Sequence, residues 1–278
     1  MISIITAIHN GLSYNQLFVS SLKKYTNSDY ELIIIDNAST DGSHEFFKKT
    51  GAKLILNKQN LSYPVCQNMG IQEAKSDHIF FLNNDLILSP SWDTRLIETA
   101  TLHNLDIVSA CGVENMGDFK TTRRFSRKWK RAKNLLLPFG FGKNNLRLMH
   151  KLMYGNWEKF CEERFKEYDH KVVEGIVGNN VMITRKGLNI AGLWDERIQA
   201  ADFDLFMRSK KISLAGGGIK PSHIALGVYI HHYIRMTSKY AVKAKPFSDI
   251  DNLIGLSDKW TKEELDLLHP DNETIRKK

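Results

Sequence analysis

An apolar run in this sequence ends abruptly in two amides and a carboxylate. Residues 79–82 are Ile-Phe-Phe-Leu, and Asn83, Asn84 and Asp85 follow at once. A buried strand that ends in a carboxylate places that group at the edge of a sheet, where open α/β folds bind ligands. A carboxylate beside amides suits a hard divalent cation that also holds phosphate oxygens. The alternative interpretation is an ordinary strand and an Asn-Asn-Asp turn, because these residues dominate turns.

Three other polar groups stand near the ends of predicted elements. Asp36 ends the apolar run that starts at Glu31, and His231-His232 lies near the end of a later apolar run. Asp202 and Asp204 lie at the start of a helical pattern over residues 201–209. Two residues of a helix turn the side chain by roughly 200°, so these two carboxylates cannot face one substrate.

Strand-like and helical patterns alternate along most of the chain. Buried β-branched and apolar runs predict the strands, and amphipathic patterns predict the helices between them. This alternation predicts an α/β fold with a mostly parallel central sheet flanked by helices. We expect strands at 2–8, 31–36, 53–56, 78–82, 106–111, 172–183 and 225–233. We expect helices after the break at 9–11 through Tyr25, after the turn at 39–42 into Phe46 and Phe47, at 64–74 and 92–103, from Arg185, and at 201–209 and 257–268.

Composition excludes several classes of protein. The 278 residues are 42% hydrophobic and 25% charged, which is typical of a globular protein. No run approaches the ~18 consecutive apolar residues of a membrane-spanning helix, and the N-terminus lacks a basic leader, so we expect a cytoplasmic protein. Neither a dinucleotide-binding Gly-x-Gly-x-x-Gly nor a phosphate-loop lysine motif is present. The cysteines are three and widely spaced, which predicts free thiols at Cys66, Cys111 and Cys161.

The positive charge is concentrated in one segment. The net charge is +8, and the eleven Lys and Arg residues between Lys120 and Lys151, with no Asp or Glu among them, leave 8 − 11 = −3 for the remainder. Phe125, Trp129, Ala132 and Leu136 can share one face of a helix there. We keep three interpretations: a solvated basic helix, a peripheral membrane contact through the Phe125 and Trp129 face, or a polyanionic acceptor that includes nucleic acid.

Several blocks, taken in order, resemble one known family. The order and spacing resemble family 2 glycosyltransferases, which are inverting enzymes of the GT-A (Rossmann-like) fold, and within them the bacterial rhamnosyltransferase-type enzymes. The resemblance covers residues 2–112 and 172–238. It rests on Thr6-Ala7-Ile8-His9-Asn10, Ile34 to Ser43, Asn60, Asn68 to Ile71, Phe81 to Asp85, Gly192 to Glu196, and Asp202-Phe203-Asp204 before Arg208.

The resemblance implies a donor and a metal site. Asp85 would hold Mn²⁺ or Mg²⁺, together with His232 or alternatively His231; Thr237 has the family's spacing from His232. Asp36 would bond the nucleotide base, although a turn or capping role is the alternative. Asn68 is assigned to the donor or, alternatively, to stapling a loop. The implied nucleotide-sugar-binding residues are Thr6, His9, Asn10, Asp36, Asn60, Asn68, Asn83 and Asn84.

The resemblance also implies a base and an acceptor site. Asp202 would be the general base, with Asp204 as the alternative; Ala201 replaces the family's leading Glu. A helix cap is the competing role for Asp202. The implied acceptor residues are Gly178, Asn179, Trp194 and Asp195, with a core position as the alternative for Trp194.

We therefore expect inverting, metal-dependent transfer of a sugar from a UDP- or dTDP-sugar to a cell-surface or lipid-linked glycan. Transfer to a nucleic acid base, a nucleotidyltransferase and a binding module are the alternatives. A nucleotidyltransferase usually has a cation in the loop after its first strand, and His9 to Ser13 lacks one. We expect residues 1–112 to form the donor half, 113–171 a basic helical insertion, 172–240 the acceptor and catalytic half, and 241–278 a tail with a helix.

Overall fold

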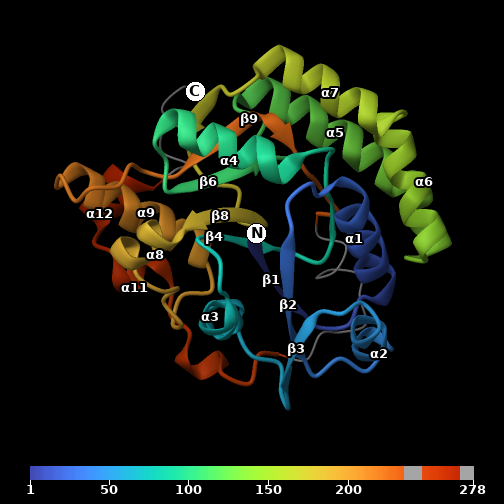
Figure 1. Ribbon diagram of the computed structural model, residues 1–278, viewed down its shortest axis with the longest axis horizontal. Helices are drawn as coiled ribbons and strands as arrows, with labels where there is room; N and C mark the ends of the chain where they lie inside the picture. The colour runs from blue at the N-terminus through green and yellow to red at the C-terminus, as the bar shows by residue number, and fades with distance from the viewer. Residues whose placement is uncertain (235–245, 270–278) are drawn as a thin grey trace.

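The computed structural model describes residues 1–234 and 246–269, and within them an eight-stranded sheet forms the centre (Figure 1). Its strand order is β3-β2-β1-β4-β8-β6-β9-β7, and a separate ribbon pairs β10 with β5. The strands are β1 (Ile2–Ile8), β2 (Tyr30–Asn37), β3 (Lys53–Asn57), β4 (His78–Leu82), β5 (Leu86–Ile87), β6 (Ile107–Cys111), β7 (Val172–Glu174), β8 (Asn180–Thr184), β9 (His223–Tyr229) and β10 (His231–His232).

The first four strands of the sheet run parallel, as the alternating pattern predicts. β1 pairs with β2 on one side and β4 on the other, and β3 extends the sheet beyond β2. The loops that follow β1, β2 and β4 therefore leave the sheet at one edge. β8 enters antiparallel between β4 and β6, and β7 is antiparallel to β9 at the far end. The predicted α/β fold with a mostly parallel sheet is confirmed.

The prediction of one strand over 172–183 is wrong. The chain forms β7 at the edge of the sheet, leaves it, and returns as β8 in the middle. Gly175 lies at the break with φ of 151°, a backbone conformation that other residues rarely adopt. Both pieces are apolar, so the sequence shows no gap between them. The predicted strand over 225–233 divides in the same way, into β9 and β10, on either side of Ile230.

Two layers of helices cover the sheet. On one face, α1 (Leu12–Tyr25), α2 (Ser43–Lys48) and α4 (Trp92–His103) pack against alternate residues of the strands, such as Ile4 and Phe80. On the other face, the intervening residues, such as Ile5 and Phe81, meet the second layer. That layer contains α3 (Tyr63–Glu73), α8 (Arg185–Ala191), α9 (Ala201–Leu214) and α12 (Lys262–Leu268), with η2 (Ile250–Asn252) and α11 (Leu256–Lys259) nearby.

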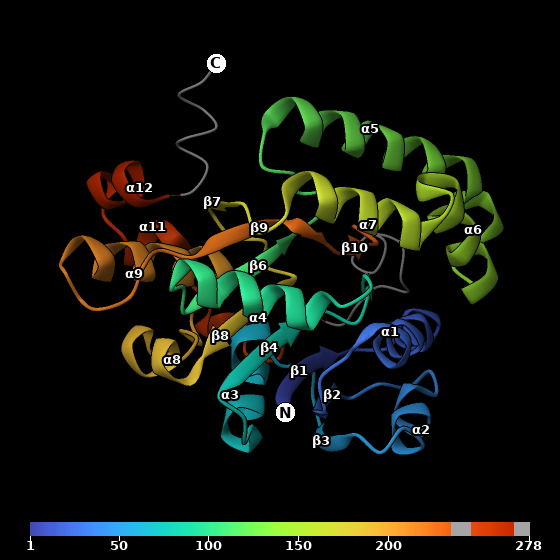
Figure 2. The ribbon, with the colours of Figure 1, turned by 45° about the horizontal axis from the view of Figure 1, so that its top comes forward.

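The insertion over residues 113–171 forms a third group of helices, which shares a core with α1, β6 and β9. It contains α5 (Phe119–Leu136), η1 (Leu137–Phe139), α6 (Lys143–Tyr154) and α7 (Trp157–Tyr168), which lie together on one side of the molecule (Figure 2). The predicted face of Trp129, Ala132 and Leu136 is buried, and Phe125 packs against Phe160. This corrects the prediction that Phe125 and Trp129 would face a membrane, because that apolar face packs inward.

Two other expectations can be compared with the described residues. Cys66, Cys111 and Cys161 are free and buried, as predicted. Among residues 1–234 and 246–269, no helix combines the length and the apolar content that crossing a bilayer requires.

Candidate functional site

The pairing of β5 with β10 brings Asp85 and His232 together. Asp85 lies between β4 and β5, and His232 is opposite Leu86 in the ribbon. The Asp85 carbonyl accepts a hydrogen bond of 3.0 Å from the Tyr233 N–H. His232 Nε2 then lies 3.3 Å from Asp85 Oδ2. The turn at 83–85 and the end of the last strand, far apart in sequence, thus form one polar corner.

Glu114 completes this corner, and sequence reasoning missed it. It lies in the loop after β6, and its Oε1 closely contacts His232 Nδ1. The Asn179 amide donates to the same oxygen at 3.1 Å. Burial lowers the pKa of His232, but Asp85 and Glu114 on its two ring nitrogens raise that pKa well above its ordinary value. The available signal was a carboxylate shortly after a buried strand, the same pattern that selected Asp36 and Asp85.

The donor atoms of the corner fit a divalent cation. Two ligands at right angles on an ion with bonds of about 2.1 Å lie about 3 Å apart, close to the 3.3 Å between His232 Nε2 and Asp85 Oδ2. A carboxylate oxygen suits Mn²⁺ or Mg²⁺, whereas the imidazole nitrogen suits the transition metal Mn²⁺ better than the hard ion Mg²⁺. No group of three His, Cys, Asp or Glu side chains within the described ranges is arranged to hold an ion. A cation here would therefore need further oxygens, such as those of a diphosphate.

His231, the alternative ligand, points into a different environment. Its side chain is fully buried among the rings of Trp129, His150 and Tyr233. Its Nδ1 lies 2.9 Å from the Tyr154 hydroxyl, and burial holds its pKa well below the ordinary value. The geometry therefore favours His232 over His231 at the corner. Thr237, whose spacing supported this choice, lies outside the described residues.

A short loop before β8 joins the polar corner to Asp202. Asn179 accepts a 2.9 Å hydrogen bond from the Asn83 N–H through its carbonyl. Its neighbour Gly178 lies directly against Asp202: a Cβ on Gly178 would be 1.9 Å from Asp202 Oδ2 and 2.4 Å from its Cγ. Only glycine therefore permits Asp202 to occupy this position. Burial raises the pKa of Asp202, as a proton acceptor for neutral pH requires.

Asp204, the alternative base, is occupied elsewhere. Its side chain is fully buried, and Arg208 Nε lies 2.8 Å from Oδ2. Its Oδ1 accepts from Trp260 Nε1 at 2.9 Å and faces Lys259 Nζ at 2.7 Å. Asp204 thus ties α9 to α11 and pairs with Arg208 within α9. By contrast, no Lys, Arg or His of the described chain forms an ion pair with Asp202.

The loops after β1 and β2 are bonded to each other. Asn10, with a left-handed φ of 61°, accepts from the Thr40 N–H through Oδ1 at 2.7 Å. His9 Nδ1 lies 2.6 Å from the Asn37 carbonyl. Asp36 is buried, accepts from the Ser39 N–H at 3.0 Å and lies 3.4 Å from His44.

Thr6 and Asn84 extend this edge of the sheet. The Thr6 hydroxyl is buried and makes no hydrogen bond with the described residues. Asn84 Nδ2 donates to Asn15 Oδ1 at 2.6 Å, and this bond fixes the turn at 83–85 to α1. Asn10, Asp36 and Asn84 thus occupy the carboxyl ends of three parallel strands.

The remaining predicted residues have mainly structural contacts. The Asn68 amide donates to the Trp194 carbonyl at 2.9 Å and accepts from the Trp194 N–H at 3.0 Å, which matches the loop-stapling alternative. Trp194 is buried between Tyr63 and Phe81, as in its core alternative. Asp195 binds Arg197 and Lys259, and these partners hold its pKa below the ordinary range.

The loop at Asn60 carries a contact from late in the chain. The Asn60 carbonyl accepts from the Ser248 N–H at 2.8 Å. Two residues on, the Ser62 hydroxyl donates to Asp249 at 2.6 Å. Residues 248–249 therefore lie beside the loop that precedes α3.

The family model for glycosyl transferase family 2 matches residues 3–185. This span includes Asp85 and Glu114, the two carboxylates of the polar corner, and the loop at 178–179. The chain belongs to glycosyl transferase family 2.

Individual relatives of this family 2 chain match over shorter stretches. The putative glycosyltransferase EpsH of Bacillus subtilis is 25% identical over 103 residues, which cover 36% of this chain and 30% of the relative. The uncharacterized glycosyltransferase EpsJ of the same organism is 30% identical over 116 residues, covering 40% and 33%. The chain thus spans about a third of the length of these two relatives.

A solved structure supports the GT-A fold. Residues 1–349 of S. aureus TarS in complex with UDP superimpose with a TM-score of 0.52 and 13% identity, covering 83% of this chain and 60% of that one. The likeness is one of fold, because the identity is low.

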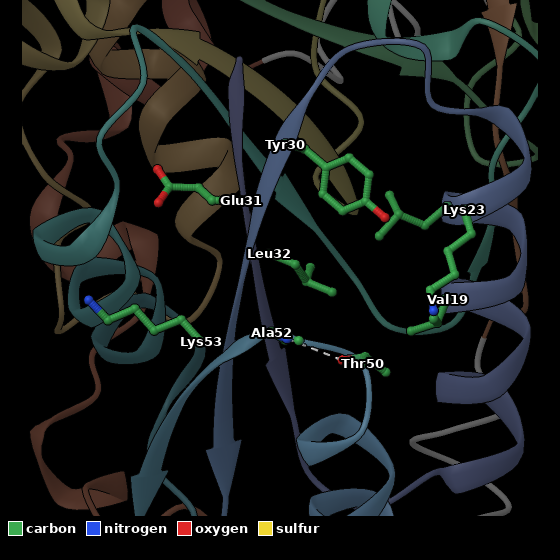
Figure 3. Close-up of a pocket in the computed structure, with 10 residues that line it drawn as sticks. Val19, Lys23, Tyr30, Glu31, Leu32, Thr50, Ala52 and Lys53 are labelled. Carbon is green, nitrogen blue, oxygen red and sulfur yellow. Dashed lines mark hydrogen bonds between the residues drawn. The ribbon is translucent and has the colours of Figure 1, made fainter.

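The chain has a cavity that lies away from the polar corner of Asp85, Glu114 and His232. Its volume is about 440 Å³, and it lies between α1 and the starts of β2 and β3 (Figure 3). Val19, Tyr30, Thr50 and Lys53 are among its lining residues, and none of the predicted site residues lines it. The start of a parallel strand is the edge opposite to the one where open sheets bind ligands. The Asp85–His232 corner, in contrast, lies beyond the carboxyl end of β4, at the edge where open sheets bind ligands.

Proposed function

We propose that this chain is an inverting, metal-dependent glycosyltransferase that transfers a sugar from a nucleotide-diphosphate sugar to an acceptor hydroxyl. The observation that carries the proposal is the loop of Gly178 and Asn179. It contacts Asp202 on one side and the Asp85–His232 corner on the other. In a sugar transfer, the general base and the group that stabilises the leaving nucleotide must both lie near the anomeric carbon. The loop of Gly178 and Asn179 brings Asp202, the proposed base, close to the Asp85–His232 corner, the proposed leaving-group site.

The donor would lie along the carboxyl ends of β1, β2 and β4. Asp36 is buried at the end of β2, where family 2 enzymes hold the nucleotide base, and Thr6, His9 and Asn10 lie in or after β1. A UDP- or dTDP-sugar is the donor we favour, since the TarS structure of similar fold is a complex with UDP. Residues 1–112 then form the donor half, with Asn60, Asn83 and Asn84 on the ribose and diphosphate side.

Asp85 and His232 would hold the Mn²⁺ or Mg²⁺ ion that family 2 implies. When bound, the ion would supply positive charge that stabilises the negative charge developing on the departing nucleotide. Glu114 and Asn179 contact His232 Nδ1 and so direct Nε2 toward Asp85. Such a second carboxylate fixes the orientation of a metal-binding imidazole and raises its basicity.

Asp202 would accept the proton of the acceptor hydroxyl. Its raised pKa makes the carboxylate a stronger base than an ordinary aspartate. The deprotonated oxygen attacks the anomeric carbon from the side opposite the nucleotide, the C–O bond to the diphosphate breaks, and the configuration inverts. A positioned base of this kind contributes ~10²–10⁴-fold to the rate. Asp204 is held by Arg208, Lys259 and Trp260 and does not suit this role.

The acceptor would approach over the loop at 178–179. Gly178 packs against the Asp202 carboxylate without a side chain between them, and Asn179 offers an amide beside the corner. A cell-surface or lipid-linked glycan, with a hexose or deoxyhexose such as rhamnose as the transferred sugar, is the substrate class we propose. The match to family 2 disfavours a nucleotidyltransferase.

A donor screen tests the proposal. Purified chain is incubated with UDP- and dTDP-sugars, with Mn²⁺ or with EDTA, and release of nucleotide is measured. We expect metal-dependent hydrolysis of one donor in wild type, none in Asp85→Ala, and a strongly reduced rate in Asp202→Asn. Asp202→Asn should still bind the donor, as seen by thermal shift, because ligand binding to the folded state raises its stability. Full activity of Asp85→Ala would refute the metal assignment.

A further inference from the structure

The outer surface of the basic helices is unusual in joining exposed apolar side chains to cations. Of thirteen large exposed hydrophobic residues in the described chain, five lie between residues 119 and 152. They are Phe119, Leu135, Phe139, Leu148 and Leu152. Phe139, on η1, is 76% exposed and Leu135 is 67% exposed. Exposed large apolar side chains that gather in one region mark an interaction site.

The charge of the segment that carries these side chains has one sign. No Asp or Glu occurs between residues 119 and 157. Arg127, Lys128 and Arg131 are exposed on α5, and none of them forms an ion pair with any residue of the described ranges. Lys151 is exposed on α6, next to Leu152. A surface with this composition repels other cations and attracts an anionic partner.

We propose that η1 and the exposed sides of α5 and α6 dock this chain on an anionic phospholipid bilayer. Side chains such as Phe139 and Leu135 would enter the boundary between head groups and acyl chains, while the cations pair with anionic head groups. This combination favours a bilayer over nucleic acid or another soluble polyanion. A soluble polyanion is held by charge and does not require exposed leucines.

The docking surface is coupled to the polar corner. Tyr233 follows His232 in the sequence, and its hydroxyl donates a 3.0 Å hydrogen bond to the carbonyl of Leu146 on α6. The Tyr154 hydroxyl, at the end of α6, lies 2.9 Å from His231 Nδ1. The helix that would face the bilayer therefore packs directly on the strand that carries His232. Docking would hold the catalytic edge at a fixed distance from the membrane, which suits an acceptor that is itself lipid-linked.

Vesicle co-sedimentation of the full chain tests docking. We expect binding to vesicles of phosphatidylcholine with phosphatidylglycerol, little binding to phosphatidylcholine alone, and partial loss in high salt. The double variant Leu135→Ser, Phe139→Ser should weaken binding by about tenfold for each side chain removed. Replacing Arg127, Lys128 and Arg131 with Gln should weaken it by about fivefold for each charge. Leu214→Ser is the matched control, because Leu214 is 65% exposed on α9, outside the basic segment.

Two results would overturn the proposal. One is equal binding of the wild type to neutral and anionic vesicles. The other is wild-type vesicle binding by the Leu135→Ser, Phe139→Ser variant, which would leave charge alone as the cause; retention of the same variant on heparin would then identify a soluble polyanion as the partner. Thermal unfolding checks that each variant is folded. Donor hydrolysis without vesicles should be unchanged in all of them, so failure of the catalytic proposal and failure of docking give different results.

Discussion

Gly178→Ala should inactivate the chain, although the substitution replaces none of the proposed catalytic side chains. A Cβ at this position would lie 1.9 Å from Asp202 Oδ2, 2.4 Å from its Cγ and 2.6 Å from its Cβ. Non-bonded heavy atoms are normally about 3.5 Å apart, so the carboxylate must move by more than about 1 Å. Because the Asp202 Cβ is also too close, a rotation of the carboxylate alone does not relieve the overlap.

The expected size of the effect follows from that displacement. A misplacement of about 1 Å costs roughly 10²-fold in rate, and the full contribution of a general base is ~10²–10⁴-fold. We therefore expect kcat to fall at least about a hundredfold in Gly178→Ala, with little change in donor affinity. Asp202→Asn should lose at least as much, since it removes the proton acceptor.

A double-mutant cycle separates this mechanism from general damage. If Gly178 acts only by leaving room for Asp202, then Gly178→Ala should have little further effect in the Asp202→Asn background, because residues that act as one unit are non-additive. Thermal unfolding of each variant is the control for folding. Near wild-type kcat in Gly178→Ala, or full additivity of the two losses, would refute the placement of Asp202.

Three further predictions concern neighbouring groups. Glu114→Gln should weaken Mn²⁺ binding in the presence of UDP by about 10–100-fold, measured by titration, because His232 loses the carboxylate that orients it; unchanged affinity would contradict this role. Asp204→Asn should lower stability by at most about 3 kcal/mol, because the partly buried Arg208 loses its charged partner while Lys259 keeps Asp195, and kcat per folded molecule should be largely kept; a folded but inactive variant would instead make Asp204 the base. Burial raises the pKa of Asp202, and the protonated acid cannot accept a proton, so kcat/KM should fall as pH decreases at values above the ordinary aspartate pKa of about 3.9; a flat profile down to about pH 4 would show that another group is the base.

The sequence predicted the parallel half of the sheet because its signals are local. Residues 2–8 and 31–36 are apolar, β-branched runs, and polar residues mark their ends, at His9 for the first and at Asp36 and Asn37 for the second. The position of β8 is a different problem. Residues 181–183 are equally apolar whether they lie at an edge or between β4 and β6, so the pairing depends on contacts far along the chain.

Some residues of the candidate site could likewise be predicted from local sequence signals, and others could not. Asp85 was visible in the sequence because it directly follows a buried strand, and Asp202 because it matches a family motif. Glu114 matched no family motif and lies three residues beyond the end of β6, and its importance appears only when the β5–β10 ribbon places His232 beside it. For Trp129, helical periodicity identified the correct face of α5, but periodicity does not say whether protein or solvent covers that face.

The position of β8 also affects how the chain is made. β4 ends at Leu82, and the strand that covers its open edge ends at Thr184, so 184 − 82 = 102 residues separate them. At a synthesis rate of 5–20 residues per second, a nascent chain would expose that edge for roughly 5–20 s. The exposed edge includes Phe80 and Phe81, and unpaired apolar strand edges promote aggregation. Residues 1–112 therefore need the later strand to complete their own sheet, and a fragment that ends there is expected to be insoluble.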